Sequence, residues 1–113
     1  MVILRQKMRS KHEKSEEVMA ALAAIIAPAR NTPGVVHLDI ARDLLDDDSF
    51  IATAVYEDGP ALERQESAAE VHRAMAMFAD ALEAPPDRTI FDASVDRTRS
   101  PALRRSGTPG ATG

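Results

Sequence analysis

The stretch Pro28-Ala29-Arg30-Asn31-Thr32-Pro33-Gly34 separates two segments of the chain that have different hydrophobic periods. Before it, apolar residues recur at the spacing that lines one face of a helix: Val18, Leu22, Ile25, Ile26 and Ala29. After it, the run Val35-Val36-His37-Leu38-Asp39-Ile40 has the β-branched character of a strand. Pro28 and the Pro33-Gly34 pair are predicted to end the helix, so the chain passes from helix to strand at this turn.

Working outward, the segments on both sides have clear periods. Residues 2–8 alternate in the manner of a strand, and Ser10-Lys11-His12-Glu13 is a capping box that is predicted to begin the helix. Residues 35–42 and 49–57 are predicted to form a hairpin whose acidic connection includes Asp46, Asp47 and Asp48. These aspartates lack the spaced ligands and closing Glu of an EF-hand, which favours a solvated turn.

A second helical region follows the hairpin. Gly59-Pro60 is predicted to end the strand and begin a short helix, and the capping box Ser67-Ala68-Ala69-Glu70 is predicted to start another. The apolar stripe predicted to be buried in this region consists of Val71, Ala74, Met75, Phe78 and Leu82. A last strand is expected over residues 89–95.

The order βαββαβ predicts an α+β, ferredoxin-like fold, with both helical regions on one face of a four-stranded antiparallel sheet. Strands two and three carry apolar residues at both parities, for example Phe50 beside Ile51. The uncovered sheet face is therefore expected to pack against a second subunit, giving a homodimer joined through the sheet faces.

Composition limits the function classes. The 113 residues suit one domain over residues 1–95, followed by a flexible tail at 96–113 that contains Arg, Pro and Gly. The domain carries ten basic against seventeen acidic residues, which argues against nucleic-acid binding. The absence of cysteine excludes disulfides and thiolate chemistry. Neither a signal peptide nor an apolar run of membrane-spanning length is present, so we expect no membrane association and a cytoplasmic location.

This arrangement resembles the antibiotic biosynthesis monooxygenase-like domains of the dimeric α+β barrel superfamily. The resemblance covers about residues 1–95 and rests on Arg30-Asn31-Thr32-Pro33-Gly34, on the turn region at Asp43, and on Ala61-Leu62 followed by a helix. Family members commonly have Glu-x-Trp before that Ala-Leu pair and two histidines after it. The corresponding positions here hold Ala54, Tyr56, Gln65 and Glu70, and His72 follows two residues later.

The resemblance implies a monooxygenase that uses neither cofactor nor metal and that oxidises a quinol or polycyclic phenol bound between the helices and the sheet. Such a pocket needs an apolar cavity and a partner for a hydroxyl group whose solution pKa is about 10. His72 is the candidate base and Tyr56 a candidate hydrogen-bond partner, and Arg30 or Arg42 could stabilise anionic charge. The expected substrate-binding residues are Arg30, Met75, Phe78, Leu22 and His37.

Structural roles compete with these assignments. His72 could lie in solvent at the edge of its helix, and Tyr56 could place its ring on the core and its hydroxyl in water. Arg30 could satisfy helix carbonyls, His37 could belong to the sheet interface, and Met75 and Phe78 could simply fill the core. Haem degradation, another activity of the superfamily, is disfavoured because those relatives distort the macrocycle with a Trp and this chain has none. His72 or His37 could still serve as an axial ligand to a haem.

Two function hypotheses therefore remain: a cofactor-independent monooxygenase, or a non-catalytic dimeric barrel that binds a small aromatic or apolar ligand or acts as an interaction module. A cavity of about 300 Å³ or more, with His72 or Tyr56 pointing inward, would favour the enzyme. A filled core, or a His72 that faces bulk water, would favour the binding module.

Overall fold

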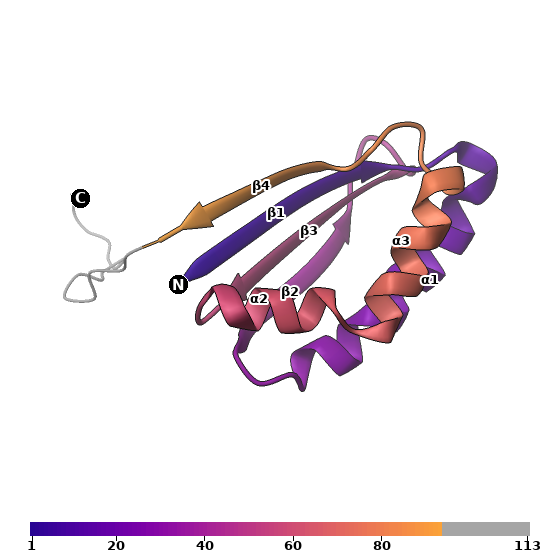
Figure 1. Cartoon of the computed structure of the whole chain (residues 1–113). Helices are drawn as coiled ribbons and strands as arrows, with labels where there is room; N and C mark the ends of the chain where they lie inside the picture. Colours follow the sequence, from indigo (N-terminus) through magenta and orange to yellow (C-terminus); the bar gives the residue numbers. More distant parts are fainter. Residues whose placement is uncertain (94–113) are drawn as a thin grey trace, which may run out of the picture.

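The computed structural model describes residues 1–93, and these form a four-stranded antiparallel sheet with its helices on one face (Figure 1). The strands are β1 (Val2–Arg9), β2 (Val35–Arg42), β3 (Ser49–Tyr56) and β4 (Asp87–Asp92), in the order β2-β3-β1-β4. The helical elements are the 3-10 turn η1 (His12–Lys14) and the helices α1 (Ser15–Arg30), α2 (Gly59–Glu66) and α3 (Ala69–Ala81). The predicted fold class is confirmed. The predicted tail at 96–113 and the end of the predicted last strand lie outside the described residues.

Strand pairing fixes which side chains face the helices. β1 pairs with β3 so that Leu4 lies opposite Ala54 and Met8 opposite Phe50, and all four side chains are buried. Because side chains alternate across a strand, the intervening residues lie on the other side of the sheet. We call that side the outer face; it carries Ile3, Ile51, Val55 and Phe91 among polar residues, and none of the described helices covers it (Figure 1).

The turn after α1 is set by Gly34. The amide of Val35 donates to the Thr32 carbonyl at 3.2 Å, with Pro33 and Gly34 at the two central positions and Gly34 at φ 89°. This is the type II arrangement, which requires a positive φ at its third residue. Packing also requires glycine at this position, because a Cβ at position 34 would lie 2.5 Å from the Ala61 Cβ.

The roles predicted for three residues at helix ends are wrong, although the second helical region does break near residue 67 as predicted. α1 continues through Pro28 to Arg30, because a proline so near the C-terminal end disturbs only the last turn. Ser10 does not cap α1: its hydroxyl lies buried and donates to the Asp48 carbonyl at 3.3 Å. Ser67 does not cap α3 either, since its hydroxyl donates back to the Glu63 carbonyl at 2.9 Å. Among the helices of residues 1–93, a side-chain N-cap forms at α2, where Asp58 accepts from the Ala61 amide at 2.9 Å.

The acidic connection between β2 and β3 is anchored to the rest of the fold. Asp46 accepts from Arg9 Nε and from the Ser49 hydroxyl, both at 2.8 Å, and Arg9 also bonds Glu83 at 2.6 Å. These donors lower the pKa of Asp46 to about 2. Asp48 is buried and contacts the ring of His12 at 3.1 Å. The prediction of a merely solvated turn is therefore wrong.

Candidate functional site

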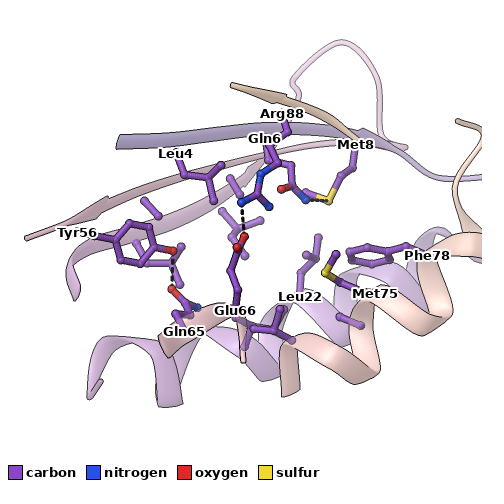
Figure 2. A pocket seen from close by; sticks show the side chains of 17 residues that line it. Leu4, Gln6, Met8, Leu22, Tyr56, Gln65, Glu66, Met75, Phe78 and Arg88 are labelled. Atoms are coloured by element: carbon purple, nitrogen blue, oxygen red, sulfur yellow. Dashed lines mark hydrogen bonds and ion pairs between the residues drawn. The ribbon is translucent and has the colours of Figure 1, made fainter. Parts of the chain in front are cut away.

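A cavity of about 80 Å³ lies between the sheet and the helices, and Figure 2 shows it from close by. The strands supply one wall and the helices the other, and most of the lining side chains are apolar. The apolar lining residues are Leu4, Met8, Leu22, Ile25, Leu38, Ile40, Ala52, Ala54, Val71, Ala74, Met75 and Phe78. The polar ones are Gln6, Tyr56, Gln65, Glu66 and Arg88. A mostly apolar lining with a few convergent polar groups is typical of small-molecule sites.

Tyr56 and Gln65 form a hydrogen-bonded pair in the wall of this cavity. The Tyr56 hydroxyl donates to Gln65 Oε1 at 2.6 Å, and the two residues are only 2% and 5% exposed. Burial raises the pKa of Tyr56 to about 12, and the negative charge of Glu66 acts in the same direction. Tyr56 is therefore neutral at physiological pH and uses its only O–H on Gln65, so it cannot be the base that accepts a substrate proton.

The pKa of Tyr56 can be measured directly, because it is the only tyrosine and the chain has no tryptophan. Alkaline titration followed by phenolate absorbance should give a midpoint near pH 12 in the folded protein. Since the folded pKa exceeds the unfolded value of about 10, this group's contribution to stability is complete below pH 10 and is lost as the pH rises toward 12. A midpoint near 10 in protein that is still folded would show that the hydroxyl is hydrated.

An ion pair occupies the rim of the cavity, where the Arg88 guanidinium of β4 contacts the Glu66 carboxylate of α2 (Figure 2). Both side chains are about one-third exposed. Arg88 reaches this position because it pairs with Gln6 across β1 and β4, which places both residues on the helix-facing side of the sheet. The chamber therefore combines a buried neutral dyad with a partly solvated charged pair.

A wider hollow of about 360 Å³ adjoins the cavity between β1, the end of α3 and the segment that leads to β4. The two spaces share Gln6, Met75 and Phe78 as lining residues. Met75 was predicted to be buried, but it is half exposed, and in Figure 2 it lies beside Phe78. A ligand larger than one ring could therefore place one end beside Tyr56 and extend past Met75.

The comparison that decides the family is a sequence match. The model of the family described as antibiotic biosynthesis monooxygenase matches residues 1–77, which is more than half of the chain. The chain belongs to the antibiotic biosynthesis monooxygenase family. No match was found among curated proteins.

Solved structures share the fold of this family member. An antibiotic biosynthesis monooxygenase structure is 17% identical with a TM-score of 0.77, over 84% of this chain and 100% of the other. A candidate antibiotic biosynthesis monooxygenase from Nitrosomonas europaea is 18% identical with a TM-score of 0.78, over 82% and 98%. A protein from Mycobacterium tuberculosis is 17% identical with a TM-score of 0.78, over 84% and 96%. At these identities the likeness shows the fold alone.

Four of the predicted site residues line the cavity of this family member: Tyr56, Leu22, Met75 and Phe78. His72 does not, because it is exposed on α3 one position after Val71, which does line the cavity. A change of one residue along a helix turns the side chain by about 100°. His37 lies on the outer face, half exposed, and contacts Asp39 at 2.6 Å. Neither histidine borders the chamber.

The two predicted arginines are also absent from the cavity wall. Arg30 donates to the Leu38 carbonyl at 3.2 Å and to Asp39 at 3.4 Å, so it ties the end of α1 to β2. Arg42 lies over the Phe50 ring at 5.4 Å, at another part of the surface. The cationic group at the chamber is Arg88. The sequence reasoning missed it because the last strand was predicted to begin at residue 89, two residues after its start at Asp87.

Gln65 and Glu66 were also missed as site residues, although Gln65 was recognised as occupying the first histidine position of the family pattern. The spacing of Gln65 from Ala61 and Leu62 places all three on one face of a helix, and these three are the buried residues of α2. A polar residue at such spacing is expected to have a buried partner. Within residues 1–93, no group of three His, Cys, Asp or Glu side chains could hold a metal ion, and no helix is long and apolar enough to cross a membrane.

Proposed function

We propose that this family member is a cofactor-independent monooxygenase that oxidises a quinol or phenol with dioxygen. The observation that carries the proposal is the buried Tyr56–Gln65 pair inside an otherwise apolar chamber. An apolar site excludes water and strengthens the few polar contacts that hold a substrate oxygen. The family membership supports the reaction class.

The proposed reaction balances without an external reductant. A quinol and one molecule of dioxygen yield a hydroxyquinone and water: one oxygen atom bonds to a ring carbon and the other leaves as water. Phenolate gives up an electron more readily than phenol, so the protein's task is to favour loss of the hydroxyl proton. Arg88 at the rim supplies positive charge that stabilises the phenolate. Glu66 is the one carboxylate among the described lining residues, and we assign it as the acceptor of the proton.

Oxygen consumption tests this proposal. Protein that has been treated with a chelator should accelerate oxygen uptake by a naphthohydroquinone above the rate of autoxidation. Arg88→Met should lower the enzymatic rate about tenfold or more, because one positioned charge typically contributes a few kcal/mol. His72→Ala should leave the rate unchanged, since His72 is exposed and outside the lining. If the protein accelerated oxygen uptake with no quinol or phenol, the proposed activity would be refuted. A large loss of rate in His72→Ala would show that His72 is the base after all.

A second candidate function is favoured by the size of the chamber and by the position of His72. The cavity beside Tyr56 is only about 80 Å³, well below the usual range for ligand sites, and His72 faces solvent. A non-catalytic module that binds a small aromatic or apolar molecule needs only an apolar cavity and no base. Binding of a quinol without any oxygen uptake would select this alternative.

We also propose a homodimer joined through the outer faces. The outer face carries apolar side chains on β1, β3 and β4: Ile3, Ile51, Val55 and Phe91. Phe91 is half exposed. Burying such a surface is favourable at about 25 cal/mol per Å² of apolar area.

Light scattering during size-exclusion chromatography tests the assembly. The native chain should have twice the monomer mass at micromolar concentration. Val55→Glu, which places a charge on the outer face of the interior strand β3, should give monomers, whereas His72→Ala on α3 should remain dimeric. A native monomer would contradict the proposed dimer.

A further inference from the structure

The amide nitrogen of Gln65 is a buried polar group of the chamber for which residues 1–93 provide no hydrogen-bond acceptor. Gln65 Oε1 accepts from the Tyr56 hydroxyl at 2.6 Å. Among residues 1–93, nothing accepts a hydrogen bond from Gln65 Nε2, although the residue is only 5% exposed and lines the cavity. Figure 2 shows the amide oxygen turned toward Tyr56 and the nitrogen turned away from it.

A buried hydrogen-bond donor that has no acceptor lowers the stability of the folded state, and most buried donors in proteins have a partner. The cost is removed if a ligand brings its own acceptor. The hydrogen bond from Tyr56 fixes the amide so that both N–H groups of Nε2 remain available. The donor is therefore oriented before any ligand binds, which lowers the entropic cost of forming the contact.

We propose that Gln65 is the residue that selects the ligand: its amide N–H donates to a carbonyl or phenolic oxygen of an aromatic ring bound against Leu22, Phe78 and Met75. The inference rests on the proposed function for the identity of the site. It adds the feature that a ligand must have, an oxygen that accepts a hydrogen bond from Gln65. A ring of the same shape without that oxygen leaves Nε2 unpaired and binds more weakly. Tyr56 is a positioning residue in this arrangement, since it acts through Gln65.

The amide signals of the protein make the contact observable. The chain contains only three side-chain amides, those of Gln6, Gln65 and Asn31. A ¹H–¹⁵N correlation spectrum therefore shows three NH₂ pairs, and the pair missing from Gln65→Leu belongs to Gln65. Two probes share one carbon skeleton: 1-tetralone carries a ring carbonyl, and tetralin does not.

We expect 1-tetralone to bind about tenfold more tightly than tetralin and to shift the Gln65 NH₂ signals, whereas tetralin leaves them nearly unchanged. In Gln65→Leu the preference for 1-tetralone should be lost or reversed, because its carbonyl would then be buried without a donor. Because the result is a ratio of two ligands in one variant, a general loss of fold affects both probes alike. His72→Ala is the matched control and should keep the native ratio, and Tyr56→Phe should reduce it only in part.

An equal affinity for both probes in the native protein, or an unchanged ratio in Gln65→Leu, would overturn the inference. So would the failure of both probes to bind, since the chamber would then not take an aromatic ring. The outcome is separate from the oxygenase proposal. Oxygen uptake with a native ratio in Gln65→Leu would refute only the selecting role of Gln65, and a Gln65-dependent preference without oxygen uptake would refute only the oxygenase.

Discussion

Replacing Gly34 by alanine is expected to lower the free energy of unfolding by about 3 kcal/mol. Two effects combine at this position. The φ of 89° lies in the left-handed region, where a side chain costs about 1–2 kcal/mol, and the new methyl group would lie 2.5 Å from the Ala61 Cβ. The turn and the start of α2 would have to separate. Urea denaturation followed by circular dichroism measures the change.

Gly59→Ala is the matched control for this prediction. Gly59 begins α2, and nothing lies within 4 Å of the position that its Cβ would occupy. Alanine is the better helix former, so this variant should be as stable as the native protein or slightly more so. An equal loss of stability in both variants, or none in Gly34→Ala, would show that the turn does not depend on a residue without a side chain.

Filling the chamber with Ala52→Leu is expected to weaken binding of a naphthohydroquinone or 1-tetralone more than tenfold. Ala52 is partly buried in β3 and lines the cavity, whose volume of about 80 Å³ leaves little room beyond the added side chain. Stability should change by less than about 2 kcal/mol, because the new carbon atoms enter existing space. Tyr56 is the only tyrosine in a chain without tryptophan, so its fluorescence reports binding at the site.

Ala76→Leu makes the same substitution on the exposed side of α3, outside the cavity lining, and should bind as the native protein does. If Ala52→Leu bound both compounds as tightly as the native chain, the ligand would have to lie elsewhere. Equal losses in the two variants would point to a general effect of the added leucine rather than to the chamber.

Much of the fold could be predicted because its elements carry local signals. The alternation in residues 2–8, the helical stripe through Val18 and Leu22, and the turn at Pro33-Gly34 all act over a few residues. The failures concern polar groups whose partners are distant in sequence. Ser10 has the sequence context of a helix cap, yet it bonds the carbonyl of Asp48, which is brought beside it only by the pairing of β1 with β3.

The candidate site was harder to predict for the same reason. Leu22, Met75 and Phe78 follow from helical periodicity, and Tyr56 follows from the end of β3. His72 has the chemistry of a base, but it lies one residue off the predicted apolar stripe of α3 and therefore faces solvent. Arg88 and Glu66 meet only because β4 pairs beside β1 and so faces α2, a relation that no local pattern encodes.

A crystal structure of the chain soaked or co-crystallised with a naphthoquinone product tests the central claim most directly. The account predicts electron density for the ring between the sheet and the helices, against Leu22 and Phe78, with one carbonyl oxygen within hydrogen-bond distance of Gln65 Nε2. Ligand density only on the outer face or beside His72, with the chamber unchanged, would contradict it.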